Sequence, residues 1–411
     1  MPVARWIELT AEGMQRLGHV KALVSLCAPT RLTSSQALNI ELSRLLRNMV
    51  PVGEPSEAVQ RYFGTRKKSR GKEGKVELQD AFLSDVRMPS QTGSLTDKAF
   101  EDGQIVNLAV ALGLLRPKNF SLTPLGEILQ QITDERKVMP FKAYSAECNP
   151  YLLKPGERAL FLFCLVSGDG DVLKRLYPKL LDFGADFHRA QAGDKLAEVF
   201  REMASDFKTK AQTVVEFSTI RKLQEYARTI ENQPITSHSG VREQRVTLRL
   251  EAFVDLGLLE KEDVSKYCYH LTAGGMCFSR KMQIAEEIGP FLEESFFQTV
   301  NECWHLGARM VDEPQEIIRL VAPPYLRLKS DLGYAPIQEM LLLANLTAIQ
   351  NAPKSLFELR NGVQAVKVLQ KEHPDDIRFS VDRRGHIRYV KFSRDVVERW
   401  TKDGGQGAEA K

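Results

Sequence analysis

The clearest pattern along the chain is a repeated order of apolar and polar positions. An apolar, helix-like run ends in Leu-Gly, two short apolar segments follow, and the second segment ends in Leu-Thr. The shared strings are Leu112-Gly113-Leu114-Leu115 before Leu122-Thr123, and Leu256-Gly257-Leu258-Leu259 before Leu271-Thr272. Glycine supplies the left-handed backbone that ends a helix, and the threonine side chain caps the next helix. Each copy therefore predicts a helix, a strand, a hairpin of variable length, a second strand and another helix.

A smaller part of this pattern, Leu-Thr-x-x-Gly, occurs three times, starting at Leu9, Leu122 and Leu271. In the copy at Leu122, Pro124 takes the first helical position, which suits its fixed backbone angle. The two full copies lie roughly 145 residues apart, a separation that indicates duplicated domains rather than a solenoid. The copy at Leu9 lacks the upstream half. It fits the last strand of an incomplete unit, a strand that pairs elsewhere, or chance.

Near the C-terminus the pattern predicts three helices and a hairpin. Helices are expected over 337–351, 354–361 and 363–373, followed by two β-rich runs within 377–392. Asp382-Arg383-Arg384-Gly385 lies between these runs and has the composition of a hairpin turn.

Helix, strand, hairpin, strand and helix make up the later half of a winged helix-turn-helix, and the stretches 97–130 and 240–282 resemble domains of that superfamily. The C-terminal pattern is a third candidate. The resemblance implies a mainly α fold with short β-hairpin wings, in which tandem winged-helix domains are joined by helical modules. Winged helices bind double-stranded DNA and also other proteins, so the resemblance implies one of these two uses.

The chain then divides into seven expected segments. They are an N-terminal helical region with a basic loop (1–75), a first winged-helix-like domain (76–145), a helical spacer (146–215), a second such domain (216–285), a helical linker (286–332), a third such domain (333–395) and a disordered tail (396–411). In the spacer, "GDGD" at 168–171 has calcium-like spacing without the remaining acidic ligands, so we expect a helix–helix turn. In the linker, Pro323-Pro324 predicts a break.

The composition is that of a soluble globular protein, with 43% apolar residues, 27% charged residues and a net charge of +4. The six cysteines include no C-x-x-C pair, and most lie in apolar runs, which indicates reduced, buried thiols. The N-terminus lacks a signal-peptide pattern, and the apolar runs are too short to span a membrane. We therefore expect a cytoplasmic protein that has no membrane partner.

The second winged-helix-like domain carries arginines on its expected recognition helix, which starts at Val241. The positions predicted to face the core are Val246, Leu250, Phe253 and Val254. The opposite side carries Arg242, Arg245 and Arg249. Arginine donates hydrogen bonds in pairs to guanine edges and to phosphate, so we expect contact with DNA in the major groove. Alternatively the arginines form a solvated face and pair in part with Glu243 and Glu251.

The third domain has two basic features. The exposed side of its last helix is expected to carry Gln364, Lys367 and Lys371. Its wing is expected to present Arg383 and Arg384 at the tip and Arg388 beyond it, together with Arg378, Lys391 and Arg394. An arginine at a hairpin tip suits a narrow minor groove. The alternative is a charged edge that prevents sheets from aggregating.

Two other regions differ in charge. The corresponding helix of the first domain shows Asp97, Glu101, Asp102 and Gln104, and this acidic face would repel phosphate, so we expect it to pack against protein. The loop 61–75 instead has a net charge of +6, and its most basic part contains Arg66, Lys67, Lys68 and Arg70. This loop fits sequence-independent contact with a phosphate backbone and, equally, a solvated linker.

Motifs for enzymatic chemistry are missing from the sequence. It contains no phosphate-binding loop, no zinc-protease motif and no nucleophile elbow. Cys268, His270 and Cys277 would give an incomplete zinc site, and Asp375-Asp376 lacks the Glu-x-Lys that a metal-dependent nuclease would supply on the next strand. We therefore expect no cofactor, no metal and no enzymatic activity.

The leading hypothesis is a non-enzymatic protein that binds double-stranded DNA through tandem winged helices. Its size suits the DNA-binding or specificity subunit of a prokaryotic DNA-processing or antiviral defence complex, with a helicase, nuclease or ATPase as protein partner, or with self-association. One alternative is an adaptor or assembly protein that uses its winged helices for protein contacts. The other is a nuclease with an unrecognised active site.

Overall fold

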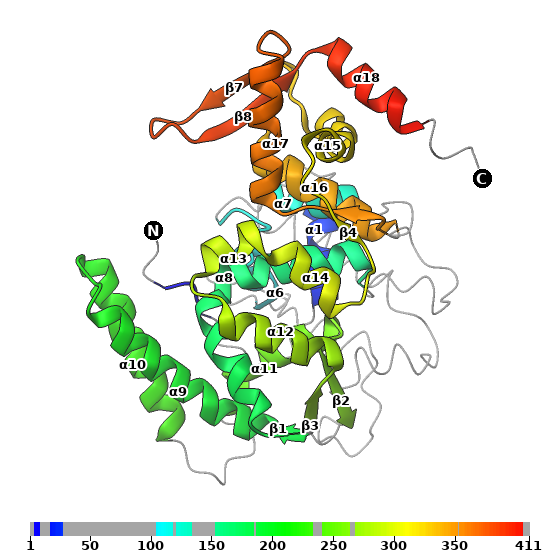
Figure 1. The fold of residues 1–411 in the computed structure, drawn as a ribbon. Coiled ribbons are helices and arrows are strands. Elements are labelled where there is room, and N and C mark those ends of the chain that lie inside the picture. Colours follow the sequence, from blue (N-terminus) through cyan, green and yellow to red (C-terminus); the bar gives the residue numbers. More distant parts are fainter. Residues whose placement is uncertain are drawn as a thin grey trace, which may run out of the picture. The chain divides into compact units, whose positions relative to one another are not determined.

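The computed structural model describes residues 4–8, 17–27, 104–117, 121–133, 153–184, 186–232, 241–263, 268–351 and 353–405 (Figure 1). This part of the chain is mainly helical, with three small sheets. It falls into two units: unit 1 takes residues up to 153 and 164–285, and unit 2 takes residues 154–163 and 286–411. Residues of the expected spacer 146–215 are thus divided between the units.

Unit 1 combines helices with one antiparallel sheet of order β1-β3-β2. The helices are α1 (Leu17–Cys27), α6 (Gln104–Ala111), α7 (Pro124–Ile132), the larger part of α8 (Pro155–Leu181), α9 (Arg189–Lys208), α10 (Val214–Glu231), α11 (Val241–Asp255) and α12 (Ala273–Ile284). The strands are β1 (Asp186–His188), β2 (Leu259–Asp263) and β3 (Cys268–Leu271). In the first copy of the repeat, the strand pair is a single antiparallel bridge between Leu115 and Leu122.

The first copy of the repeat closes through hydrogen bonds around one threonine. Gly113 has a φ of 70°, which ends the helical run at the expected position. Thr123 N donates to Leu114 O at 3.1 Å, and the Thr123 hydroxyl donates to Gly113 O. The same hydroxyl oxygen caps α7 by accepting from Gly126 N at 3.1 Å. One threonine therefore joins the end of one helix to the start of the next.

The second copy repeats this closure atom for atom. Gly257 has a φ of 71°, and Thr272 N donates to Leu258 O at 3.2 Å. The Thr272 hydroxyl donates to Gly257 O at 3.0 Å and accepts from Gly275 N at 3.0 Å. The predicted order of helix, paired strands and helix is confirmed for the second copy, whereas in the first copy the strand pair is reduced to the Leu115–Leu122 bridge.

The glycine of Leu-Thr-x-x-Gly is required because the capped helix touches the backbone of the closure. A Cβ atom added at Gly126 would collide with Leu114 O, and one added at Gly275 would collide with Leu258 O. The motif is therefore a packing device in which threonine caps a helix and glycine lets it approach. The copy at Leu9 lies outside the described residues.

The N-terminal residues 4–8 form an extended strap against α8. Arg5 N donates to the Asp171 carboxylate at 2.6 Å, Asp171 N donates to Arg5 O at 3.1 Å, and Ile7 N donates to the Asp169 carboxylate at 2.8 Å. Helix α8 runs without interruption through 168–171, so the predicted helix–helix turn is wrong. The "GDGD" stretch is instead the part of α8 that binds the strap, through the carboxylates of Asp169 and Asp171.

Helix α11 lies in the core of unit 1 and packs against α9 and α10. Val246, Leu250 and Phe253 are fully buried, as predicted, whereas Val254 is half-buried. The residues between them are buried as well, so that every position from 246 to 253 is covered. The expectation that α11 keeps one solvent-exposed side is therefore wrong over this stretch.

Unit 2 begins with the start of α8 and continues with seven elements that precede α17. These are α13 (Ile288–Glu294), α14 (Phe296–Cys303), β4 (Arg309–Met310), α15 (Pro314–Leu328), β5 (Ala335–Pro336), α16 (Ile337–Gln350) and β6 (Ser355–Leu356). The rest is α17 (Leu359–Glu372), β7 (Ile377–Val381), β8 (Ile387–Phe392) and α18 (Arg394–Gly405). One sheet is antiparallel with the order β5-β8-β7, and the other is a short parallel pair of β4 and β6.

The helix expected over 354–361 is wrong, because Ser355 and Leu356 form β6 and Glu358 is extended. Arg309 N donates to Lys354 O at 3.0 Å in the β4–β6 pair. The buried side-chain amide of Asn345 then bonds both the N–H and the C=O of Phe357, each at 3.0 Å. Helix α17 therefore starts at Leu359, beyond the residues that make these bonds. The helix predicted over 337–351 is confirmed as α16.

The predicted helix break at Pro323-Pro324 and the predicted disorder of the C-terminal tail up to residue 405 are also wrong. Helix α15 continues through Pro323 and Pro324 to Leu328, because it packs against α16, α17 and α18. Residues 394–405, of which 396–405 were expected to be disordered, form α18, whose buried Val396 and Val397 attach it to the unit.

Several predictions fall outside the described residues. They concern the basic loop 61–75 with Arg66, Lys67, Lys68 and Arg70, the acidic residues Asp97, Glu101 and Asp102, and the side chains of Gln104 and Arg242. Of the cysteines whose side chains are described, Cys164 and Cys303 are buried, Cys268 and Cys277 are half-buried, and all are free thiols. None of the described helices is long and apolar enough to cross a membrane.

Candidate nucleic-acid interface

The β7–β8 hairpin of unit 2 projects beyond the helices of the unit (Figure 1). Its strands pair from Ile377 opposite Phe392 to Val381 opposite Ile387. Core packing holds only the base, where Ile377, Val390 and Phe392 are buried. The hairpin expected from the sequence is therefore confirmed, and its outer half is exposed to solvent.

Asp382 organises the turn at the tip. Its carboxylate accepts hydrogen bonds from the backbone N–H groups of Arg384 and His386, at 2.8 and 3.0 Å, and from Arg388 Nε at 3.1 Å. The backbone hydrogen bond from His386 is the largest of the effects that hold the pKa of Asp382 below its ordinary value. Gly385 completes the turn with a φ of 80°. The carboxylate thus fixes the backbone under the tip arginines and binds Arg388 rather than either of them.

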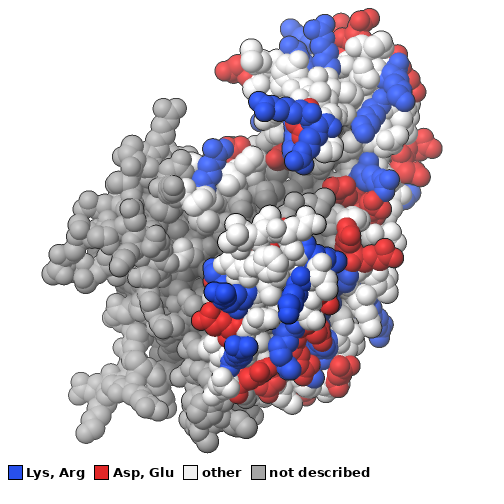
Figure 2. Space-filling view, turned by 90° about the vertical axis from the view of Figure 1, so that its left-hand side faces the viewer, with Lys and Arg blue, Asp and Glu red and all other residues white. Residues whose placement is uncertain are grey.

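The tip presents two arginines that form no ion pair within the described chain. Both of them, Arg383 and Arg384, are exposed. Arg378 on β7 is exposed and unpaired in the same sense. Arg388 is exposed but pairs with Asp382 at 3.1 Å. Figure 2 shows Lys and Arg side chains gathered on the part of unit 2 that carries this hairpin.

Helix α17 adds a polar stripe that leads toward the hairpin. Ala365, Val366 and Leu369 are buried, whereas Gln364, Lys367 and Lys371 are exposed, as their spacing predicts. Both lysines are free of ion pairs within the described chain. The helix ends at Glu372, and β7 starts five residues later at Ile377, so stripe and hairpin belong to one continuous segment. Its exposed surface has the cations and the amide that phosphate contacts use.

Arg249 was expected on the exposed face of α11, and this placement is wrong. Its side chain is 2% exposed, and its Nε lies 2.6 Å from the equally buried Asp169 carboxylate. Its Nη2 donates to the other Asp169 oxygen at 2.7 Å and to Ile7 O of the strap at 3.2 Å. Because an acid from α8 and a carbonyl from the strap bind the guanidinium inside the unit, Arg249 is unavailable to DNA.

Arg245 is also engaged within unit 1. Its guanidinium carbon lies 3.3 Å from the centroid of the Tyr226 ring on α10, in a cation–π stack. Burial is the largest effect on its pKa, which it lowers from the ordinary arginine value. The Tyr226 hydroxyl in turn donates to Glu8 of the strap at 3.0 Å. Of the three arginines expected to read DNA from α11, these two therefore pack inside the unit.

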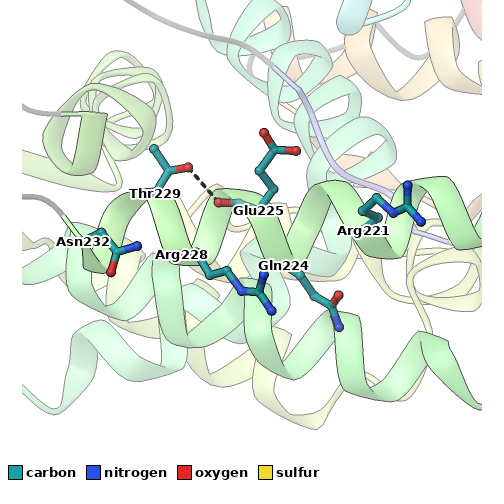
Figure 3. Close-up of a pocket in the computed structure, with 6 residues that line it drawn as sticks. All are labelled: Arg221, Gln224, Glu225, Arg228, Thr229 and Asn232. Carbon is teal, nitrogen blue, oxygen red and sulfur yellow. Dashed lines mark hydrogen bonds between the residues drawn. The ribbon is translucent and has the colours of Figure 1, made fainter.

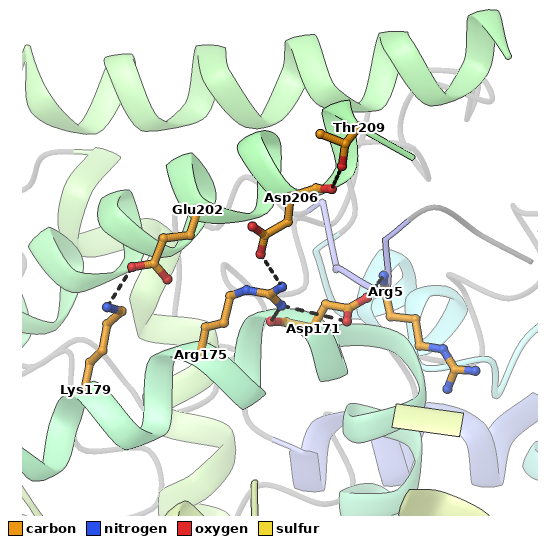
Figure 4. Close-up of polar contacts among 7 residues, drawn as sticks. All are labelled: Arg5, Asp171, Arg175, Lys179, Glu202, Asp206 and Thr209. Carbon is orange, nitrogen blue, oxygen red and sulfur yellow. Dashed lines mark hydrogen bonds and ion pairs between the residues drawn. The ribbon is translucent and has the colours of Figure 1, made fainter. Parts of the chain in front are cut away.

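Other cations of unit 1 are paired with acids on neighbouring helices. Arg175 on α8 binds Asp206 on α9 at 2.9 Å, and Lys179 binds Glu202 at 2.9 Å (Figure 4). On the part of the surface formed by unit 1, acidic and basic side chains accordingly alternate (Figure 2). This pattern is typical of a surface that neutralises itself.

A shallow pocket of about 330 Å³ lies on α10, and its lining residues project from this one helix (Figure 3). They are Arg221, Gln224, Glu225, Arg228, Thr229 and Asn232. The Thr229 hydroxyl donates to Glu225 O at 2.8 Å, so the one hydroxyl in the lining is already bonded to the backbone. The lining contains no histidine or cysteine that could activate a nucleophile. The pocket gives no support to a catalytic site.

The sequence interpretation missed two features of the interface. It placed Asp382 in the hairpin turn but gave its side chain no role, although an aspartate followed by Arg-Arg-Gly is typical of a side chain that bonds the turn after it. It also gave no weight to Tyr389 and Val381, which are exposed on the hairpin. The signal that could have indicated them is the presence of large apolar residues among the charged positions of the two β-rich runs.

Within the described chain, no group of three or more His, Cys, Asp or Glu side chains is placed to hold a metal ion. Comparison with models of protein families, with curated proteins and with solved structures found no match to this chain.

Proposed function

We propose that the protein binds double-stranded DNA without enzymatic action, and that the β7–β8 hairpin and α17 of unit 2 form the binding surface. The observation that carries this proposal is the set of exposed cations with no acid partner among the described residues: Lys367, Lys371, Arg378, Arg383 and Arg384. Clustered cations of this kind displace counterions from a phosphate backbone and gain affinity by doing so.

In this proposal, α17 with β7 and β8 acts as a winged helix that binds DNA. A second winged helix consists of α11 with β2 and β3, but its helix α11 is buried in the core of unit 1. The arginines at the hairpin tip contact backbone or minor groove, because a turn held by Asp382 presents them away from the unit. A protein of this design suits the DNA-binding or specificity subunit of a prokaryotic DNA-processing or defence complex. That role remains part of the proposal.

The test measures binding of the full chain to a labelled random duplex at several salt concentrations, with no ATP or metal added. We expect binding that weakens steeply as salt rises. The variant Arg383→Ala/Arg384→Ala should reduce affinity roughly five- to thirtyfold, as expected for two exposed charge contacts, and lower the salt slope by about 2.

A matched control removes the same charge from the same unit. Arg360 and Arg394 are exposed but bound to Glu294 and Glu398, so Arg360→Ala/Arg394→Ala should bind DNA nearly as well as the wild type. Equal losses in both double variants would mean that net charge, and not the hairpin, drives binding. No binding at micromolar protein in low salt would refute the proposed function.

A second candidate function, self-association through unit 1, is favoured by one observation. Val214 and Phe217 on the first turns of α10 are 86% and 52% exposed, and Val215 beside them is exposed too. The capping box of Thr213 and Glu216 holds this apolar turn in helical form. Light scattering over a concentration series would test it: Val214→Glu/Phe217→Glu should dissociate an oligomer that the wild type forms.

A further inference from the structure

The outer half of the β7–β8 hairpin is apolar as well as basic. Val381 is 57% exposed and Tyr389 is 46% exposed, and Ile387, which pairs with Val381, is half-buried. The Tyr389 hydroxyl has no hydrogen-bond partner among the described residues. Val381 and Ile387 lie beyond the base of the hairpin, whereas Tyr389 lies next to the buried Val390 and opposite Pro336 of β5.

Apolar cross-strand pairs such as Val381 with Ile387 stabilise a hairpin, but they do not account for the exposed ring of Tyr389, whose cross-strand neighbours are Ser380 and Pro336. Single exposed apolar residues are common on protein surfaces. Here, however, they occupy successive cross-strand positions, with Ser380 opposite Tyr389 and Val381 opposite Ile387. Arg388 is the extra residue at a register shift between these two rows, and such bulges re-aim side chains. Because Ser380 and Val381 are successive residues of β7, their pairs point to opposite faces: Tyr389 shares its face with the exposed Arg378, whereas Val381 and Ile387 lie on the other face.

The mixture of chemistry selects one class of ligand. Arg383, Arg384 and Arg388 require anions, whereas the ring of Tyr389 requires a flat apolar partner. A nucleic acid supplies both when a base face is accessible, since bases stack on aromatic side chains and phosphates flank them. In an intact duplex the base faces are covered by their neighbours, and exposing one costs unstacking energy.

We infer that Tyr389 stacks on a base at an opened step of the duplex, so that the hairpin prefers DNA with a gap or an unpaired base over intact duplex. This inference rests on the proposed function and names the form of DNA that the same site binds best. Asp382 contributes by holding the backbone of the turn and the Arg388 side chain in place.

The experiment compares three labelled ligands with the full-length protein: an intact duplex, the same duplex with a one-nucleotide gap, and the corresponding single strand. The wild type should bind the gapped duplex roughly five- to a hundredfold more tightly than the intact one, as expected from stacking on one base. Tyr389→Ala should bring this ratio close to one and change affinity for intact duplex little. Tyr389→Phe keeps the ring and should keep the ratio.

Ser380→Ala is the matched control, because Ser380 lies directly opposite Tyr389 and is exposed. It should leave the ratio unchanged. A fluorescent base analogue placed opposite the gap gives a second readout: its emission should fall on binding to the wild type and to Tyr389→Phe, but not to Tyr389→Ala.

Three results would overturn the inference. Intact-duplex binding with no preference for the gap would refute it and leave the proposed function standing, as would an unchanged ratio in Tyr389→Ala. If the wild type bound none of the ligands, both would fail. A Tyr389-dependent dimer in sedimentation experiments would then assign the surface to protein contact.

Discussion

Unit 1 and unit 2 each contain a helix that leads into a β-hairpin, and the cations of these two segments have opposite surroundings. In unit 1, Arg249 on α11 is paired with Asp169, and Lys261 on β2 is paired with the buried Glu251 at 2.8 Å. In unit 2, the lysines of α17 and the arginines at the hairpin tip are exposed and unpaired within the described chain. Arginines at helical spacing therefore do not by themselves mark a nucleic-acid surface. The difference is whether an acid from elsewhere in the chain neutralises them.

The largest expected effect concerns the buried pair. Arg249→Ala leaves the Asp169 carboxylate buried without its partner, which should lower the free energy of unfolding by about 3–5 kcal/mol. Arg384→Ala, an exposed change in unit 2, should alter it by about 0.5 kcal/mol or less. Urea unfolding of both variants measures the contrast. If Arg249→Ala were as stable as the wild type and bound DNA poorly, the assignment of roles to the two units would be reversed.

The second effect compares buried acids with and without a cation. Glu358 is buried directly before α17, and its carboxylate accepts from Phe297 N and Gln298 N at the start of α14, at 3.1 and 2.7 Å. Within the described residues it has no cation partner, unlike Asp169. Burial raises its pKa from 4.5 to about 7, although the backbone hydrogen bonds act in the opposite direction.

The native state therefore binds this proton more tightly than the unfolded chain. The stabilisation is fully present below about pH 4.5 and is lost as pH rises through about 7, by up to about 3 kcal/mol. Urea unfolding at a series of pH values measures it. Glu358→Gln, which stays neutral, should remove this part of the pH dependence; an identical pH dependence in the variant would contradict the assignment.

A smaller effect is expected from the α17 stripe. Lys367→Ala/Lys371→Ala should weaken duplex binding severalfold, equally for all DNA sequences, because exposed lysines contact phosphate and not base edges. Melting temperature should stay unchanged, since both side chains are solvent-exposed. Binding titrations with two unrelated duplexes measure the effect. A change in preference between the duplexes would indicate that α17 contacts base edges.

The smallest effect concerns Arg245, which the sequence placed beside Arg249 on a DNA-reading face. Arg245→Ala should cost about 1 kcal/mol of stability, the size of a partly desolvated cation–π contact with Tyr226. Duplex affinity and sequence preference should stay unchanged. A loss of sequence preference without a loss of stability would restore the original hypothesis for α11.

Short-range features could be predicted from the sequence, and long-range partners could not. The Leu-Gly stops at Gly113 and Gly257, the threonine caps and the turn before Gly385 each depend on residues close in sequence, and the structure confirms them. The exposed stripe of α17 follows from helical spacing alone. These are the features on which the proposed interface depends.

The failures have distant causes. Arg249 looked solvent-exposed because its partners, Asp169 and Ile7, precede it by 80 and 242 residues. The segment 354–358 has a helical pattern, but a strand pair with β4 and the clamp from Asn345 outweigh local propensity. Asp169 and Asp171 looked like turn residues because the strap that binds them is remote in sequence.

The strap has a consequence for the order in which unit 1 assembles. Residues 4–8 are synthesised long before their partners, since Asp169 follows Ile7 by 162 residues and Arg249 follows it by 242 residues. Contacts this far apart close large loops, and they form late because the entropy of closure must be offset first. We therefore expect the ion pair between Asp169 and Arg249 to form before the strap binds, or at the same time. Refolding that starts from a chain with residues 4–8 removed would reveal whether seating the strap is the final, rate-limiting step.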